Sequence, residues 1–363
     1  MTKYLPDELA IEILVRLSTK DLARFKCVSK TWRGLINHRG FIELYQNNSP
    51  AKFVSFYDKD LYMLDVESKR PAITNPLKLD FPLDQSMIDE STCVLHCDGT
   101  LCVTLKNHTF MVWNPSSKQF KILPNPGIYP DSNILGFGYD PVHDDYKVVK
   151  FINRRDASTA HVFEFRTGSW RESLRIPNPD WYYRDRRGTL LDQYLYWIAY
   201  RSSTDRFILC FNLSTHEYRK FPLSVYNQGV TCSWLGVTSQ KLCITEYETC
   251  RKEIKISVME KTGSSWNKII SLSTSSFISV HDHIYDYQVE FVSFTKRNDL
   301  VVTFTGYKDN FEMETEERTK TKVFLYKTGD EKFEQVQFCN SLAGLRFLCE
   351  FVETPKITNR IFT

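Results

Sequence analysis

The sequence predicts an α+β multidomain protein, in which a small all-α module of three helices precedes an all-β, propeller-like domain of about six blades. Three observations support this prediction. Apolar residues recur at helical spacing over the first 36 residues, whereas strand-like apolar runs separated by turn residues fill the rest of the chain. One strand–turn–strand pattern also repeats about every fifty residues along that second part. With 363 residues, the chain is long enough for both domains.

The amino-terminal module is predicted to form three short helices between residues 4 and 36. Pro6 suits the first helical position, because the N–H group that it lacks would be unpaired there. Ser18 and Ser29 are the expected caps of the second and third helices. The apolar positions at helical spacing are Leu9, Ile13, Leu14, Leu17, Leu22, Phe25, Val28, Trp32, Leu35 and Ile36.

This module is too small to bury its own apolar side chains. Only 32 residues run from Leu5 to Ile36, and chains below about 40 residues rarely fold alone without disulfides, a metal or a partner. Cys27 is the one cysteine in this stretch. Seven basic residues between positions 16 and 39 face one acid, Asp21; they are Arg16, Lys20, Arg24, Lys26, Lys30, Arg33 and Arg39. We therefore expect the apolar surface to be covered by an acidic partner protein or by the rest of the chain.

The repeat in the second part is defined by an apolar strand, a turn rich in Ser, Thr, Gly or Asn, and another strand. The equivalent positions are Leu64, Trp113, Phe165, Phe211, Met259 and Tyr326, which lie 49, 52, 46, 48 and 67 residues apart. The long last step contains a polar insertion at Tyr307–Lys322. Such a period is typical of β-propellers, in which each blade is buried only by its neighbours. A β-sandwich or two stacked barrels is the alternative.

The first repeat, Phe53–Val66, supplies only a hairpin, which is too little for a four-stranded blade. The segment Phe347–Val352 alternates apolar and polar residues as a strand does. Because propellers commonly close by pairing strands from both ends of the chain, we expect this segment to complete the first blade.

Composition excludes several classes of function. The net charge of +3 is too small for a dedicated nucleic-acid-binding protein, and no run of apolar residues is long enough to span a membrane. The ten cysteines are scattered without a CxxC pair, which indicates reduced core residues. Neither Cys93-x-x-His96-Cys97 nor His281-Asp282-His283 matches a metal site, and the Gly136-Phe137-Gly138 stretch lacks the third glycine of a phosphate loop. We expect no metal, no cofactor and no catalytic site.

One loop carries the residue types that dominate protein interfaces. It is Trp181-Tyr182-Tyr183-Arg184-Asp185-Arg186-Arg187, in which three aromatic residues precede three arginines. Trp181, Tyr182, Tyr183, Arg184, Arg186 and Arg187 are thus predicted to bind a substrate with an acidic surface. A solvated turn with one aromatic residue tucked inward is the alternative interpretation.

The helical module resembles an F-box, which docks on a Skp-family adaptor and through it on a cullin ubiquitin ligase. The resemblance implies that the adaptor is contacted by Leu5, Pro6, Ile13, Leu14, Leu17, Leu22, Val28 and Trp32. A DNA-binding helix-turn-helix is a rival, but it would need a recognition helix rich in Arg, Asn or Gln, whereas the third helix is short and apolar on one side.

The second part resembles the F-box-associated domain of plant F-box proteins, including S-locus members. The motifs that support this are Cys97–Cys102, Trp113-Asn114-Pro115, Gly136–Asp140 with Asp145–Val149, Ser169-Trp170-Arg171 and Ser341-Leu342. We therefore expect an F-box at 1–45, a linker at 46–51, a propeller-like domain at 52–355 and a tail at 356–363. The implied function is that of a non-catalytic substrate receptor of an SCF-type ubiquitin ligase, cytoplasmic or nuclear, that recruits an unknown protein. A scaffold outside any ligase and a propeller enzyme are the alternatives.

Overall fold

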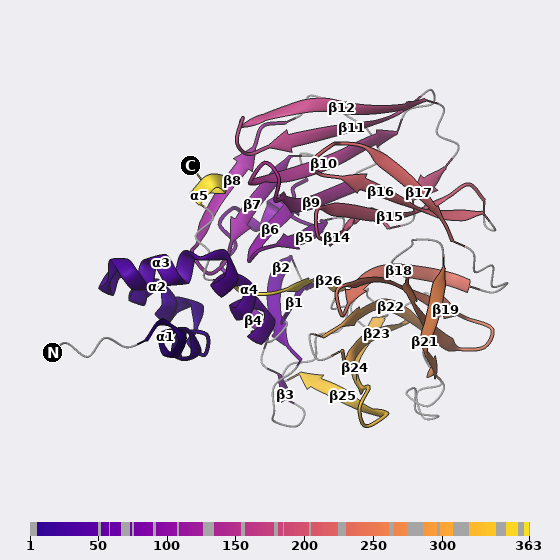
Figure 1. The fold of residues 1–363 in the computed structure, drawn as a ribbon. Coiled ribbons are helices and arrows are strands. Elements are labelled where there is room, and N and C mark those ends of the chain that lie inside the picture. Colours follow the sequence, from indigo (N-terminus) through magenta and orange to yellow (C-terminus); the bar gives the residue numbers. More distant parts are fainter. Residues whose placement is uncertain are drawn as a thin grey trace.

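The structure is a computed structural model of the 363-residue chain. It describes residues 6–49, 52–57, 59–66, 73–74, 76–89, 92–106, 109–125, 134–153, 157–177, 181–183, 185–202, 205–223, 230–260, 265–274, 286–295, 298–307, 319–338, 346–354 and 359–362. A helical module lies at one side of a ring of six β-sheets (Figure 1). The predicted combination of a helical module with a six-bladed propeller is confirmed.

The helical module contains four helices where the sequence predicted three. They are α1 (Asp7–Leu14), α2 (Thr19–Val28), α3 (Lys30–Asn37) and α4 (Arg39–Asn48). The predicted caps are present, since Ser18 accepts a hydrogen bond from Asp21 N and Ser29 from Trp32 N. The expectation that strands follow the first 36 residues directly was wrong for α4. This helix buries Phe41, Ile42 and Tyr45 on one face, and it continues into the segment that was predicted as the linker.

The fourth helix supplies much of the module's core. Leu14, Leu22 and Ile36 from the first three helices pack with Phe41 and Tyr45 from α4. The Tyr45 hydroxyl also donates to Leu17 O at 3.0 Å and so ties α4 to the end of α1. Helix α4 thus buries part of the apolar surface that the first 36 residues cannot bury by themselves.

Six antiparallel blades form the propeller, and they are numbered here in chain order. Blade 1 consists of β26 (Arg346–Phe351), β1 (Lys52–Tyr57), β2 (Asp60–Asp65) and β4 (Leu77–Lys78), and blade 2 of β5 (Val94–Cys97), β6 (Thr100–Thr104), β7 (Phe110–Asn114) and β8 (Gln119–Leu123). Blade 3 consists of β9 (Ile134–Asp140), β10 (Asp145–Asn153), β11 (Ala157–Glu164) and β12 (Ser169–Pro177). Blade 4 consists of β13 (Tyr182–Tyr183), β14 (Thr189–Leu191), β15 (Tyr194–Tyr200), β16 (Arg206–Asn212) and β17 (Tyr218–Pro222).

Blade 5 consists of β18 (Val230–Thr238), β19 (Lys241–Glu248), β20 (Glu253–Met259) and β21 (Trp266–Ser273). Blade 6 consists of β22 (Asp286–Phe294), β23 (Leu300–Tyr307), β24 (Thr319–Lys327) and β25 (Lys332–Phe338), to which the short β3 (Ile73–Thr74) adds in parallel. A 3₁₀ turn (Gln85–Met87) and the helix α5 (Asn359–Phe362) complete the described elements.

The predicted repeat coincides with one place in every blade. Leu64, Trp113, Phe211, Met259 and Tyr326 lie in the third strand of their blades, and Phe165 follows the third strand β11 directly. The turn motif of the repeat therefore joins the third strand to the fourth. The predicted ring closure is also confirmed, because β26 pairs antiparallel with β1, with Phe351 opposite Lys52 and Glu350 opposite Phe53.

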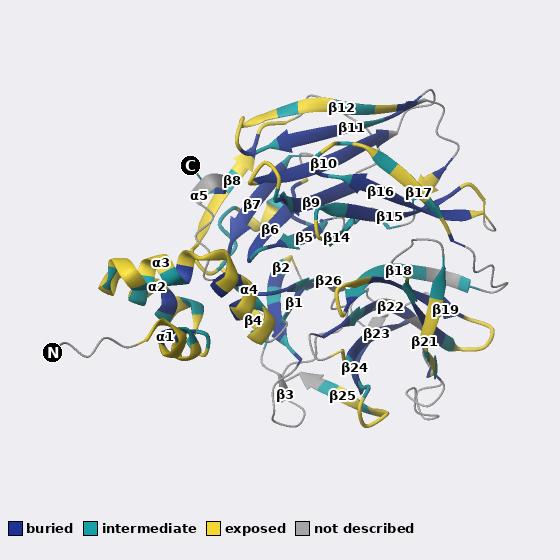
Figure 2. Ribbon diagram, viewed as in Figure 1, coloured by how far each residue is buried: buried dark blue, intermediate teal, exposed yellow. Residues whose placement is uncertain are grey.

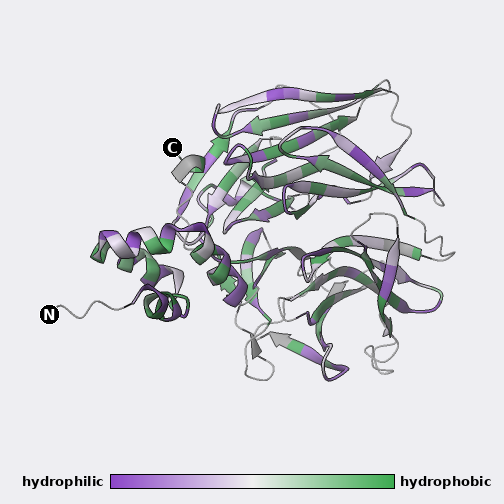
Figure 3. Ribbon diagram, viewed as in Figure 1, coloured by the Kyte–Doolittle hydropathy of each residue, from purple (hydrophilic) through white to green (hydrophobic). Residues whose placement is uncertain are grey.

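The propeller is held together by apolar layers between neighbouring blades. Trp113 packs with residues of blade 1, Trp197 with residues of blade 3, and Phe304 with residues of blade 5. The middle strands of the blades are therefore buried, while outer strands such as β8 and β12 are largely exposed (Figure 2). Apolar segments occur on strands throughout the ring (Figure 3). Trp170 and Trp266 also pack between blades.

The meander gives the ring two different faces. In blades 2 to 6, the turns from the first strand to the second and from the third to the fourth lie at one face, here called the turn face. The second-to-third connections and the connections between blades lie at the opposite face, here called the connection face. The helical module contacts the turn face, through the turn between β5 and β6.

Candidate functional sites: an apolar helical face and a central channel

The first candidate site is an apolar face on the helical module. Leu9 and Ile13 of α1 are 48% and 52% exposed, and Val28 at the end of α2 is 69% exposed. Pro6 is also exposed, while Phe25 and Trp32 are partly buried, with ring centroids 5.0 Å apart. Single exposed apolar residues are common, but several of them on so small a module make it a candidate for docking to a partner.

The structure divides the predicted adaptor contacts into two groups. Pro6, Ile13 and Val28 are exposed, and Leu17 and Trp32 are partly exposed. Leu14 and Leu22 are 1% and 0% exposed and lie in the core of the module, so their side chains are not open to an adaptor in this structure. Helical spacing could not separate them, because the inward and outward stripes overlap on short helices. Leu5 lies outside the described residues.

The predicted basic outer face is present with one exception. Arg16, Lys20, Arg24, Lys30, Arg33 and Arg39 are exposed. Lys26 is buried, and burial together with the charge of Arg33 lowers the pKa of its ammonium to about 8. Arg33 Nε donates to Lys26 O at 3.0 Å, which joins α3 to α2.

Helix α4 and the first turn of α2 attach the module to the propeller. Gln46 Nε2 donates to Asp98 Oδ1 at 3.2 Å. Thr19 Oγ1 donates to Glu353 Oε2 at 2.9 Å, and Lys52 Nζ binds the other oxygen of Glu353 at 2.5 Å. Sequence reasoning missed these contacts, since they join residues that are far apart along the chain.

The turn Asp98-Gly99 is the propeller's part of this attachment. Both residues have positive φ, and a Cβ on Gly99 would lie 2.4 Å from Thr354 Cγ2, so only glycine fits there. Asp98 Oδ2 accepts a hydrogen bond from the Tyr146 hydroxyl at 2.8 Å. Burial, followed by the charge of Asp98, raises the pKa of Tyr146 well above its ordinary value. The predicted Cys97–Cys102 motif thus marks the junction of the two domains.

The second candidate site is a central channel of about 530 Å³, which is within the size range of ligand pockets. Every blade contributes lining residues from its inner strand. They include His96 and Asp98 of blade 2, Phe137 of blade 3, Thr189 and Leu190 of blade 4, Trp234 and Gly236 of blade 5, Ser293 of blade 6, and Cys349 and Glu350 of blade 1. Gln46 and Asn47 of α4 line the end of the channel at the turn face.

Within the predicted substrate loop, residues 181–187, Tyr182 and Tyr183 form the short inner strand β13 of blade 4, and Arg187 forms a parallel bridge with Leu135 of β9. Tyr182 and Tyr183 pair with Tyr200 and Ala199 of β15, and β14 continues along the same strand after an interruption. Trp181 is 7% exposed and packs edge-on against Phe207, so the expectation of an exposed anchor was wrong for this residue. The sequence did not indicate that Trp181 would pack on Phe207 of β16, which is 26 residues further along the chain.

The other residues of this segment have different surroundings. Tyr183 is partly buried and its hydroxyl accepts from Trp181 Nε1 at 3.0 Å, whereas Tyr182 is 44% exposed and stacks on Tyr200. Arg187 forms an ion pair with Asp185, with Nη2 to Oδ2 at 2.9 Å and Nε to Oδ1 at 3.0 Å, and both side chains line the channel. Arg186 is exposed, and Arg184 lies outside the described residues. The predicted basic patch is therefore reduced, because Asp185 neutralises Arg187.

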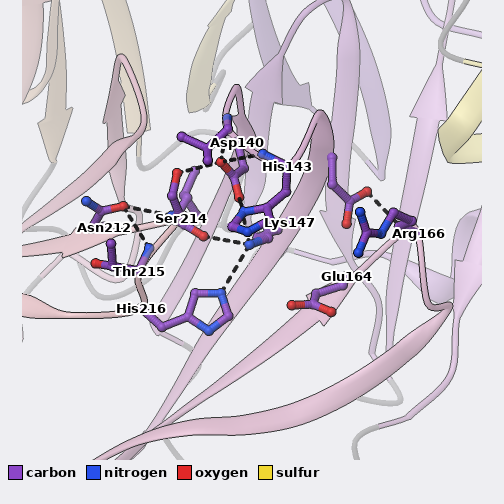
Figure 4. Close-up of polar contacts among 12 residues, drawn as sticks. Asp140, His143, Lys147, Glu164, Arg166, Asn212, Ser214, Thr215 and His216 are labelled. Carbon is purple, nitrogen blue, oxygen red and sulfur yellow. Dashed lines mark hydrogen bonds and ion pairs between the residues drawn. The ribbon is translucent and has the colours of Figure 1, made fainter.

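A polar cluster lies between blades 3 and 4 (Figure 4). Asp140 and Lys147, which are 0% and 3% exposed, form an ion pair at 2.8 Å. Lys147 Nζ also donates to Leu213 O at 2.7 Å, and Asp140 accepts from Ser214 Oγ and contacts His143 Nδ1 at 2.7 Å. Although burial opposes it, hydrogen bonds from Lys147, Ser214 and His143 lower the pKa of Asp140. The serine bonds the carboxylate and not the histidine, so this arrangement is a link between blades.

We also searched the described part of the chain for metal sites and membrane-spanning helices. Groups of three or more His, Cys, Asp or Glu side chains that could hold a metal ion do not occur among the described residues. Nor do those residues form a helix long and apolar enough to cross a membrane. His281-Asp282-His283 and residues 308–318 of the predicted insertion lie outside the described ranges.

Comparison with known proteins agrees with this division of the chain. The family model of the F-box domain matches residues 4–44, and that of the F-box associated beta propeller domain matches residues 52–354. The chain is 83% identical over 362 residues to the F-box protein At3g16210 of Arabidopsis thaliana, a match that covers 100% of both chains. It is 26% identical over 373 residues to the F-box protein At4g10190 of the same plant, which covers 96% of this chain and 97% of that one.

A solved structure of a protein from Lactobacillus plantarum has a similar fold. The TM-score is 0.50 at 9% sequence identity, and the match covers 84% of this chain and 98% of that chain. At this identity the likeness concerns the fold alone.

The fold is that of a two-domain protein, in which a small helical module is joined to a six-bladed propeller with a lined central cavity. The family matches then make the class specific. The chain belongs to the F-box proteins that carry an F-box-associated propeller domain.

Proposed function

We propose that this protein is a substrate-recognition subunit of an SCF-type ubiquitin ligase, with the F-box on the adaptor and the propeller on a protein substrate. The observation that carries the proposal is the exposed apolar face of the helical module. Leu9, Ile13 and Val28 remain open to solvent even though α4 and the propeller cover other parts of the module. A Skp-family adaptor is the partner that the family implies for this face, and through it a cullin.

The attachment of the two domains supports the same function. The contacts of Gln46 and Thr19 with the propeller hold the module at the turn face, while Ile13 and Val28 stay exposed. An adaptor and a substrate can therefore be bound at the same time. F-box proteins are typically non-catalytic, so we propose that the propeller positions the substrate and performs no chemistry. We propose the cytoplasm or the nucleus as its location, where such ligases act.

Adaptor capture tests the proposal directly. In Val28→Asp, docking would bury an unpaired carboxylate, which costs several kcal/mol, so we expect co-purification of a Skp-family adaptor to fall about tenfold or more. The matched control is Val142→Asp, because Val142 is 68% exposed and lies in the turn after β9 of the propeller. This control should retain wild-type adaptor binding.

The result also separates the proposal from its rival, a scaffold that works outside a ligase. A scaffold outside a ligase need not bind a Skp-family adaptor, so Val28→Asp would have no selective effect on adaptor capture. If Val28→Asp and Val142→Asp capture the adaptor equally well, the apolar face is not the adaptor site and the proposed function fails.

A further inference from the structure

A groove lies between the helical module and the propeller. Its volume is about 600 Å³, and its propeller side is formed by Lys52 and Glu353. Helix α4 lies between the first three helices and the propeller (Figure 1), and the ends of α1 and α4 form the other side of the groove. The lining residues on that side are Glu12, Val15, Arg16, Leu17, Ser18, Tyr45, Asn48 and Ser49. The groove is therefore created by the two domains together.

Four charged side chains line this groove. Lys52 and Glu353 form an ion pair at 2.5 Å, so their charges largely cancel. Glu12 and Arg16 are exposed, and neither side chain forms a hydrogen bond or an ion pair with another described residue. Arg16 also belongs to the basic outer face of the module, and it is the residue of that face that lines the groove. A carboxylate of a partner would find an unpaired guanidinium there.

The groove is continuous with the face proposed to bind the adaptor. Leu17, which is among the predicted adaptor contacts, is partly exposed and lines the groove. Ile13 is 52% exposed, and Arg16 N donates to its carbonyl oxygen at 3.2 Å, so Arg16 lies one turn beyond Ile13. A partner that covers Ile13 and Leu17 therefore also reaches the groove.

The size of the apolar face points in the same direction. A stable protein interface typically involves about 20–30 residues on each side. The apolar residues that are exposed or partly exposed on this face are Pro6, Leu9, Ile13, Leu17, Val28 and Trp32. An adaptor must therefore contact further surface beside them, and the groove is the adjoining hollow.

We propose that the adaptor extends from the apolar face into this groove, where a carboxylate-bearing segment of the adaptor binds Arg16 and the adaptor contacts Lys52 and Glu353 of the propeller. This deepens the proposed function and rests on it, because it assigns a second contact surface to the same partner. An adaptor that touches both domains holds the propeller, and a substrate bound to it, in a fixed orientation.

Photo-crosslinking from the groove tests the contact directly. Asn48 is replaced by p-benzoylphenylalanine in the full-length chain, which is irradiated in complex with a purified Skp-family adaptor. We expect a covalent product that contains both proteins. The control carries the same residue at Ile269, which is 48% exposed on the outer strand of blade 5, and it should give no such product.

Filling the groove tests whether the adaptor needs it. Asn48→Trp places a large side chain in the groove and should weaken adaptor binding about tenfold. Leu44→Trp is the matched control, because Leu44 is 41% exposed on the same helix and does not line the groove. This control should bind the adaptor as the wild type does. Biolayer interferometry with the purified full-length chain measures both affinities.

The charge of Arg16 is tested by a pair of substitutions. Arg16→Gln should weaken adaptor binding about threefold at low salt, whereas Arg16→Lys keeps the charge and should bind nearly as well as the wild type. The difference between the two variants should shrink at high salt, since an exposed ion pair is screened.

Equal affinities of Asn48→Trp and Leu44→Trp would overturn the proposal, as would wild-type affinity of Arg16→Gln or the lack of a crosslink from position 48 in a chain that captures the adaptor. If Asn48→Trp does not fold, the crosslink and the Arg16 variants decide. Val28→Asp tests the proposed function separately. Normal binding by the groove variants together with weak capture by Val28→Asp would contradict the groove proposal alone, whereas a wild-type chain that captures no adaptor would contradict both.

Discussion

At the residue scale, Asp140 shows how a polar group can hold two blades together. It lies at the end of β9 and is fully buried, yet it has a cation from its own blade and a hydroxyl from blade 4 as partners. Breaking a buried ion pair by removing one partner typically costs 3–5 kcal/mol, because the other charge stays buried without compensation. Packing of blade 3 on blade 4 therefore explains Asp140 and Lys147 of the Gly136–Asp140 and Asp145–Val149 motif.

We predict that Asp140→Asn lowers the stability of the propeller by about 3 kcal/mol near neutral pH. Its effect should shrink in acid. The pKa of Asp140 is held below the ordinary value of about 3.9, so its contribution is present above that value and is lost as the pH falls through the folded pKa. Denaturant unfolding between pH 7 and about pH 3 measures this.

The control for this prediction is Asp144→Asn in the same turn. Asp144 is exposed and has positive φ, a conformation that asparagine also tolerates. It should show wild-type stability at neutral pH. A loss in Asp140→Asn that is no larger than that in Asp144→Asn would mean that the buried ion pair does not stabilise the propeller.

At the element scale, β9 illustrates why glycine is needed within a strand. Gly136 and Gly138 face blade 4, where Cβ atoms would lie 2.5 Å from Leu195 Cδ1 and 2.5 Å from Leu190 Cδ1. Neither glycine has positive φ, so their role is close packing of one blade on the next.

We predict that Gly136→Ala destabilises the propeller by about 1–3 kcal/mol, since Leu195 and Trp197 would have to move. Gly329→Ala is the matched control, because a Cβ at Gly329 meets nothing within 4 Å. Thermal unfolding of both variants measures the difference. An equal Tm for the two alanine variants would show that β9 does not need glycine for packing.

At the scale of the whole molecule, stability depends on closing the ring. The inner strand of blade 1 is β26, so the first blade is incomplete until the end of the chain has been made. Phe351 of β26 is fully buried in the layer between blades 1 and 2. The same strand continues into Glu353, which binds the helical module through Thr19.

We predict that deleting residues 340–363 unfolds the propeller cooperatively. Phe351→Ala is a milder form of this test and should cost about 3–5 kcal/mol. Phe120→Ala on β8 is the control, since Phe120 is 43% exposed and should lose little. Unchanged melting of the truncated chain would contradict closure through β26.

The sequence by itself determined the class of both domains, the caps of α2 and α3, the third-strand repeat and the closing strand. These features are set by local hydrogen bonding and by the spacing of apolar residues, both of which can be read along the chain. Only the tertiary structure decided that Leu14 and Leu22 are core while Ile13 and Val28 are exposed, and that α4 joins the module to the propeller. It alone placed Trp181 in the core and brought Asp98, Glu350 and Trp234 into one channel. The physical reason is that burial, charge cancellation and a shared cavity depend on residues from different blades, which no local pattern records.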